Sequence, residues 1–184
     1  MELDADLGIS VRYNRILRPE VIARFPRGIV NTHGGILPEY RGSYCNINAI
    51  LNGEKEYDVT LHYIEEGVDT GDIVDTLTVP VREEDTGFSL YRASERLCYE
   101  IVKKNLEDLL RGRCRGVPQE SLVRAGRAAR TYRSAETLAQ KRVTEADIAS
   151  GLALRKVRAF DSDAHEPAYM ELDGRRVYLR LKYA

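Results

Sequence analysis

The fold of this chain is decided by residues 31–42, which read NTHGGILPEYRG. They follow a short apolar run at residues 28–30, a pattern typical of a buried strand that ends at a site. Side chains two positions apart on a strand project to the same side, so we expect Asn31 and His33 to share one face. An amide donor beside an imidazole is suited to stabilising a developing oxyanion. The stretch therefore predicts a strand whose carboxyl end carries a polar site.

The segment before this stretch predicts a strand, a short helix and a second strand. Residues 7–13 are β-rich, and Pro19 and Glu20 are typical of the first turn of a helix. Such a unit most simply forms a parallel pair with a right-handed crossover. Ligands of parallel sheets bind at the carboxyl ends of the strands, which is where Asn31 and His33 fall.

The segment after it predicts a hairpin and a long helix. Residues 57–64 and 73–81 are β-rich, and the polar connection at residues 65–71 contains two glycines. Thr86 is placed to cap an amphipathic helix that extends to about residue 110.

The remaining local patterns predict two further helices and a second hairpin. We expect Ser43 to cap a helix that ends near residue 51. Thr144 and Asp147 form a box-like start for a helix that extends to about residue 153. Residues 168–182 contain Asp-Gly between two β-rich runs, which predicts a hairpin.

Composition excludes several classes of function. The 184 residues carry 28 Lys and Arg against 29 Asp and Glu, which argues against a dedicated nucleic-acid binder. A local cluster of arginines at residues 111–133 leaves open a phosphate contact, although a solvated segment is the simpler interpretation. The three cysteines and three histidines show no metal-ligand spacing, so we expect no metal. No apolar run is long enough to cross a membrane, and we expect a cytoplasmic protein.

Two blocks of sequence resemble the signature of the folate-dependent formyltransferases. Residues 31–42 hold Asn-x-His, then Leu-Pro and Arg-Gly, and residues 59–73 read VTLHYIEEGVDTGDI, with an acidic loop and Asp-x-Gly. The resemblance implies an α/β fold with a Rossmann-like sheet and a small carboxyl-terminal helix and hairpin. It places a catalytic core at residues 1–112 and an extension at residues 113–184.

The same resemblance implies the site residues and the reaction, which is formyl transfer to an amine. Asn31 and His33 stabilise the oxyanion, with His33 held protonated, and Asp69 orients His33 and manages protons. By its position alone, Asp69 is more typical of a turn residue that caps its own loop. His62 is interpreted as a structural or supporting residue.

The resemblance also implies the cosubstrate and the acceptor. N10-formyltetrahydrofolate is expected between two segments whose contact residues are Arg15, Ile16, Leu17, Glu66, Gly67 and Val68. The acceptor is expected to be a nucleotide-linked amino sugar of the dTDP type, used for surface polysaccharide and bound by Gly35, Tyr40 and Arg41. We further expect a homodimer that binds neither nucleic acid nor membrane.

One departure from the family pattern opens alternatives. Family members carry further strands before the segment that matches residue 6, so the strand at residues 7–13 is expected to leave an open edge and apolar surface. We therefore expect poor solubility or self-association. The alternatives to a sugar formyltransferase are an incomplete unit with only a structural or interaction role, and a formyltetrahydrofolate hydrolase.

Overall fold

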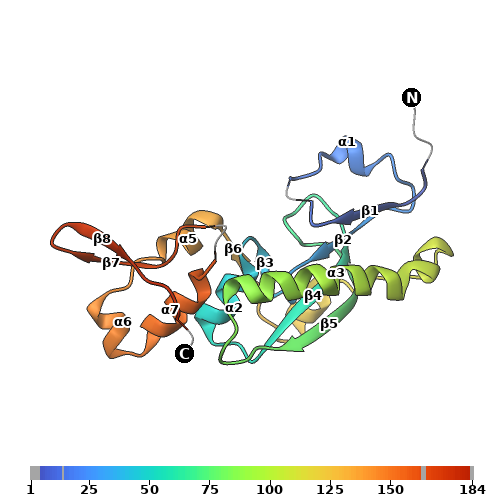
Figure 1. Ribbon diagram of the computed structural model, residues 1–184. Coiled ribbons are helices and arrows are strands. Elements are labelled where there is room, and N and C mark those ends of the chain that lie inside the picture. The colour runs from blue at the N-terminus through green and yellow to red at the C-terminus, as the bar shows by residue number, and fades with distance from the viewer. Residues whose placement is uncertain (1–4, 14, 163–164, 183–184) are drawn as a thin grey trace. The chain divides into compact units, whose positions relative to one another are not determined.

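The computed structural model in Figure 1 describes residues 5–13, 15–162 and 165–182. Packing groups the described residues into two compact units. The first unit is drawn from Met1–Gly42, Asp58–Thr78 and Ser94–Thr131, and the second from Ser43–Tyr57, Val79–Ala93 and Tyr132–Ala184. Because these units follow packing along several segments, the division of the sequence at residue 112 stays a prediction.

A four-stranded sheet organises the first unit. Its order is β1-β2-β4-β5, with β1 at Gly8–Val11, β2 at Ile29–His33, β4 at Glu56–Tyr63 and β5 at Ile73–Pro80. β1 and β2 are parallel, and the four-residue helix α1 (Pro19–Ile22) lies between them in the chain. This confirms the predicted strand, helix and strand, and the mixed α/β class.

The pairing of β2 with β4 is antiparallel, and its register decides the composition of the site. Asn31 lies opposite His62, and His33 lies opposite Thr60. Directly opposed residues of an antiparallel pair project to the same face of the sheet. Four polar side chains from two strands therefore gather on one face near the end of β2.

The core of the first unit lies around the two central strands. Val30, Val59 and Leu61 are fully buried, and Ile101 of helix α3 (Gly87–Leu110) is buried with them. α3 begins as predicted, because the Thr86 hydroxyl accepts a hydrogen bond from the amide of Ser89 at 3.1 Å.

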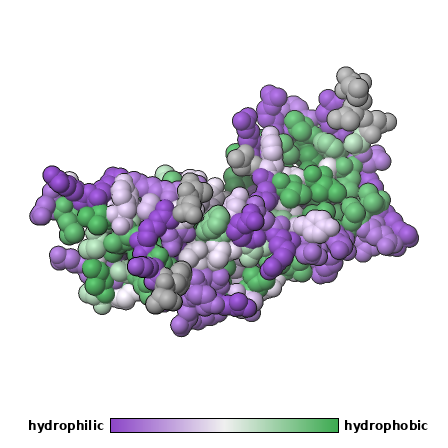
Figure 2. Space-filling view, viewed as in Figure 1, coloured by the Kyte–Doolittle hydropathy of each residue, from purple (hydrophilic) through white to green (hydrophobic). Residues whose placement is uncertain are grey.

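The edge strand β1 exposes apolar side chains. Ile9 and Val11 on β1 are 40% and 50% exposed, and Ile16 in the following loop is 79% exposed. Figure 2 shows apolar surface gathered over the part of the molecule that carries β1. The open apolar edge expected from the sequence is therefore present.

Three short elements complete the first unit beside the site. β3 (Arg41–Gly42) follows the glycine-rich loop and pairs with β6 (Thr131–Tyr132). Helix α4 (Gln119–Arg124) begins directly after Pro118, a residue whose fixed φ suits the start of a helix. No helix was predicted for the residues of α4.

In the second unit, helix α2 (Cys45–Asn52) packs against helix α7 (Leu152–Phe160). The prediction that Ser43 caps α2 is wrong. Tyr44 precedes the helix in a left-handed conformation with φ of 57°, and no side chain caps the start. The predicted end is confirmed, because Gly53 closes α2 with φ of 72°.

The helix predicted from Thr144 to residue 153 is two helices. The Thr144–Asp147 capping box starts α6 (Glu145–Ala149) as expected. Gly151 then adopts a left-handed φ of 75°, which ends α6, and α7 starts as a separate helix.

A helix and a hairpin complete the second unit. Helix α5 (Ser134–Ala139) lies in the stretch for which no regular structure was expected. The carboxyl-terminal hairpin pairs β7 (Tyr169–Leu172) with β8 (Arg175–Tyr178), and both residues of its Asp173-Gly174 turn have positive φ. This confirms the predicted hairpin and its turn.

Candidate active site

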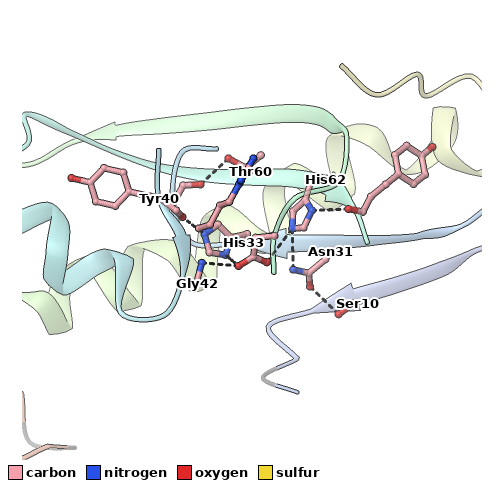
Figure 3. Close-up of polar contacts among 12 residues, drawn as sticks. Ser10, Asn31, His33, Tyr40, Gly42, Thr60 and His62 are labelled. Atoms are coloured by element: carbon pink, nitrogen blue, oxygen red, sulfur yellow. Dashed lines mark hydrogen bonds and ion pairs between the residues drawn. The ribbon is translucent and has the colours of Figure 1, made fainter. Parts of the chain in front are cut away.

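Three polar side chains of the first unit gather around the carboxylate of Asp69. Asn31 and His33 come from β2, His62 comes from β4, and Asp69 comes from the loop between β4 and β5. Figure 3 shows the two imidazoles and the Asn31 amide turned toward one another. Asp69 has a positive φ of 52°, a conformation that few residues other than glycine adopt and that recurs at functional sites.

His33 is held on both of its ring nitrogens. Its Nε2 lies 2.5 Å from the main-chain carbonyl of Tyr40, and its Nδ1 lies 3.4 Å from Oδ2 of Asp69. The ring is 8% exposed, so these contacts fix it within the protein. The amide of Gly42 donates to the same Asp69 oxygen at 2.9 Å.

His62 makes the matching pair of contacts from the neighbouring strand. Its Nδ1 lies 2.7 Å from the carbonyl of Tyr63, and its Nε2 lies 3.5 Å from Oδ1 of Asp69. The Asn31 Nδ2 lies 3.3 Å from the same Nε2, and the Ser10 hydroxyl donates to Asn31 Oδ1 at 2.9 Å. His62 therefore connects the amide to the carboxylate.

These partners assign the tautomers of both rings. A carbonyl oxygen only accepts hydrogen bonds, so His33 carries a proton on Nε2 and His62 carries one on Nδ1. The two remaining nitrogens, His33 Nδ1 and His62 Nε2, both face Asp69. When the imidazoles are neutral, each of these nitrogens presents a lone pair toward the carboxylate. The cluster is thus arranged to take up one further proton.

The charges of the cluster follow from burial and from these contacts. Burial lowers the pKa of His33, and the attraction of Asp69 only partly offsets this. Burial works against ionisation of Asp69 as well, but its contacts with His62, with His33 and with the Gly42 amide together lower its pKa to about 2. This direction runs against the expectation that Asp69 holds His33 protonated, because burial outweighs the attraction.

Two of the predicted acceptor-binding residues, Gly35 and Tyr40, lie against the His33 ring. Gly35 is buried, and a Cβ placed there would lie 2.8 Å from the Tyr40 carbonyl and 3.0 Å from Nε2 of His33. The Thr60 hydroxyl donates to the Gly35 carbonyl at 2.7 Å. Tyr40 is 8% exposed, and Arg41 is half-buried with its guanidinium bonded to Gln119.

The residues expected to hold the cosubstrate lie in two loops with open side chains. Arg15 and Ile16 are exposed and Leu17 is half-buried in the loop after β1. In the loop after β4, Glu66, Gly67 and Val68 are exposed to solvent. Their role as a folate site stays a prediction.

Several arginines of the expected basic cluster are paired with carboxylates of the chain. Arg127 forms a bidentate pair with Glu39, at 2.7 and 2.6 Å. Arg111, Arg113, Arg124 and Arg133 also lie in ion pairs.

Throughout the described part of the chain, no group of three or more His, Cys, Asp and Glu side chains could hold a metal ion. Within that same part, no helix combines the length and the apolar character needed to cross a membrane.

Two residues of this neighbourhood were given too little weight by the sequence. His62 was interpreted only as a supporting residue, and Gln119 was not singled out. The alternation of Thr60 and His62 with apolar neighbours matches that of Asn31 and His33. An antiparallel pairing of the two strands would have predicted the shared face.

Fold and site together define an α/β protein whose buried imidazoles, with a half-buried amide and carboxylate, suit acyl transfer. Residues 1–106 match the formyl transferase family. The chain belongs to that family. It is 32% identical over 118 residues to a methionyl-tRNA formyltransferase of Listeria monocytogenes, which covers 64% of this chain and 38% of that protein. The chain therefore spans less than two fifths of the length of this relative.

Solved structures with the same fold include sugar N-formyltransferases. A 4-N formyltransferase from Francisella tularensis superimposes with a TM-score of 0.82 over 97% of this chain and 72% of that chain, at 20% identity. A Helicobacter canadensis N-formyltransferase, in complex with folinic acid and dTDP-3-aminofucose, gives 0.74 over 92% and 59%, at 23% identity. HypX from Aquifex aeolicus with tetrahydrofolic acid gives 0.73 over 96% and 29%, at 28% identity.

Proposed function

We propose that the protein transfers a formyl group from N10-formyltetrahydrofolate to the amine of a nucleotide-linked amino sugar. The observation that carries the proposal is the cluster of Asn31, His33, His62 and Asp69 on a formyl transferase fold. In the overall reaction the amine nitrogen bonds to the formyl carbon, and the bond between that carbon and N10 breaks. The proton lost by the amine ends on N10.

The chain supplies a hydrogen-bond donor for the charge that develops on oxygen. Asn31 is the only one of the four cluster residues with an amide, and it is half-buried. Ser10 and His62 fix its two ends at 2.9 and 3.3 Å, so its direction is set before the reaction. A donor that is already oriented contributes about 10²–10³ in rate at such a site.

The chain also supplies a place for the proton that the amine sheds. Neutral His33 has a lone pair on Nδ1, beside the ionised Asp69. When that nitrogen takes up a proton, the lone pair that faced the carboxylate is replaced by a donor to it. Asp69 thus stabilises the charged imidazole that forms during the reaction, and His33 acts as the base.

The two exposed loops suit a flat ring with polar edges. Ile16 and Val68 present apolar side chains that are 79% and 44% exposed, one from each loop. Binding sites for planar cosubstrates combine such apolar surfaces with a few polar groups. The cosubstrate brings an activated formyl group, and these loops would hold it against the end of β2.

The acceptor is the part of the proposal with two candidates. The structural relatives include an N-formyltransferase solved with dTDP-3-aminofucose, which favours an amino sugar. The name of the curated relative favours methionyl-tRNA instead. A net charge of −1 and the pairing of several arginines with carboxylates favour the small acceptor.

A single competition experiment tests the acceptor. The chain is incubated with N10-formyltetrahydrofolate and one of three acceptors: a panel of dTDP-amino sugars, methionyl-tRNA, or water alone. Products are identified by mass. Formylated sugar supports the proposal, whereas formylated methionyl-tRNA or free formate would replace it with a tRNA formyltransferase or a hydrolase. Loss of all turnover with retained folate binding would indicate the structural unit considered above.

Two further properties belong to the same proposal. A cytoplasmic location agrees with the free cysteines at positions 45, 98 and 114. The homodimer expected from the sequence is part of this proposal. Sedimentation at several protein concentrations would show a monomer instead if the expectation is wrong.

A further inference from the structure

The side-chain amide of Gln119 contacts the loop that carries Asp69, and all of the amide's hydrogen-bonding groups have partners. Its Nε2 donates to the carbonyls of Asp69 and Gly71, at 2.9 and 2.7 Å. Its Oε1 accepts from Nε and Nη2 of Arg41, at 3.0 and 2.8 Å. Gln119 is 2% exposed. The opposite orientation of the amide would place its oxygen against two carbonyl oxygens, so only this orientation satisfies all four partners.

These bonds close a ring around the carboxylate. Arg41 precedes Gly42 in β3, and the Gly42 amide donates to Oδ2 of Asp69 at 2.9 Å. The main chain of Asp69 is bonded to Gln119, and Gln119 is bonded back to Arg41. The side chain and the main chain of Asp69 are thus anchored from one connected set of groups.

Such anchoring matters because Asp69 has an unfavourable backbone conformation. Its φ of 52° lies in the left-handed region, which costs free energy for residues other than glycine unless the surroundings hold it. Its carboxylate must nevertheless face both His33 Nδ1 and His62 Nε2, at 3.4 and 3.5 Å. A small rotation of this loop would break both relationships together.

We propose that Gln119 is a positioning residue for the reaction, which holds the Asp69 loop and the Arg41 guanidinium in one fixed arrangement. The proposal that Asp69 and Arg41 serve formyl transfer underlies its functional part. The geometric part concerns only where Asp69 lies and does not depend on the identity of the acceptor.

The geometric part is tested by titrating the His33 ring by NMR in the wild type and in Gln119→Met. Methionine has a similar volume but no amide, so Asp69 loses its main-chain anchor. Because Asp69 raises the pKa of His33, a displaced carboxylate lowers that pKa further. Asn48→Leu is the matched control, since Asn48 is a 1% exposed amide of the other unit. An unchanged His33 pKa in folded Gln119→Met overturns the proposal.

The functional part is tested by steady-state kinetics with the preferred acceptor. Gln119→Glu keeps an oxygen for Arg41 but lacks the two donors to the loop. We expect both Gln119 variants to lower kcat by about 10- to 100-fold, with little change in the KM for the folate. Equal kcat in the wild type and the variants would overturn the positioning role. If neither the wild type nor the variants were active, that result would count against the proposed function alone.

A measurement on the wild type covers the case in which the variants do not fold. Scalar couplings through hydrogen bonds join a donor nitrogen to the carbonyl carbon that accepts from it. We expect couplings from Gln119 Nε2 to the carbonyl carbons of both Asp69 and Gly71. Their absence in the folded protein would contradict the ring.

Discussion

His62 lies directly opposite Asn31 on the neighbouring strand, and its Nε2 is 3.5 Å from Oδ1 of Asp69. The same nitrogen lies 3.3 Å from the Asn31 amide. His62 therefore fixes the direction of the proposed oxyanion donor and borders the carboxylate that is proposed to stabilise the charged His33. This makes it a positioning residue, although nothing in its local sequence pattern distinguishes it.

Replacing His62 by leucine is expected to impair both stability and turnover. The Asn31 amide loses its acceptor, and a buried group left without a partner costs about 1–3 kcal/mol. We expect kcat to fall about tenfold or more because Asn31 is then free to turn. Chemical denaturation and steady-state kinetics measure the two effects. His165→Leu, at an exposed position, is the control and should leave both quantities near the wild-type values.

Replacing Asp69 by asparagine is expected to lower the pKa of His33 further. Burial already lowers that pKa, and the charge of Asp69 is the largest influence that raises it. Removal of the charge leaves burial less opposed, so the ring should titrate at a lower pH than in the wild type. An NMR titration of His33 measures the change, and a rise in the pKa would contradict the proposed arrangement.

The dependence of stability on pH follows from the same two groups, and both act in one direction. A lowered His33 pKa means that the unfolded chain binds a proton more readily as the pH falls below about 6.5, so stability decreases there. The shift of Asp69 from 3.8 to about 2 contributes about 2 kcal/mol that is present above pH 3.8 and is lost toward pH 2.

Denaturation across this pH range measures the effect. We expect a first decrease in the free energy of unfolding below pH 6.5 and a second below pH 4. In Asp69→Asn the second decrease should be smaller. An equal second decrease in that variant would assign the acid sensitivity to other carboxylates.

Gly71 is expected to tolerate no side chain, because a Cβ there would overlap the main-chain carbonyl of Tyr63. Backbone cannot yield as a flexible side chain does, so Gly71→Ala should destabilise the protein by about 1–3 kcal/mol. The Asp69 loop would move with it. Gly126→Asn is the control, since nothing lies within 4 Å of its Cβ position and only the strain of its φ of 99° opposes the substitution. Thermal denaturation of the two variants compares them, and equal melting temperatures would contradict the account.

The parts of the fold that sequence could predict are those set by local patterns. Apolar and β-rich runs predicted the strands, the Asp173-Gly174 turn predicted the last hairpin, and Thr86 predicted the start of α3. The start of α2 was wrong because Tyr44 takes a left-handed conformation that no local preference indicates. Gly151 is a residue at which a helix can end, and the sequence shows it. Whether the helix ends there depends on the helix that follows.

The site was predictable to the extent that one strand carries it. Asn31 and His33 share a strand. His33 contacts Asp69 directly, and Asn31 is connected to Asp69 through His62. The contributions of His62 and Gln119 depend on strand register and on a contact between residues 50 positions apart. Neither property can be read from spacing along the chain. The resting charge of His33 also depends on burial, which only the packed structure defines.

The most direct test of the central claim is formyl transfer by the wild-type chain and by His33→Ala under the same conditions. The acceptor is a dTDP-amino sugar, the donor is N10-formyltetrahydrofolate, and the formylated product is quantified by mass. We predict product with the wild type and a loss of at least about 10²-fold in the variant, in which the base is absent. Equal product from both proteins would contradict the assignment of this cluster as the active site.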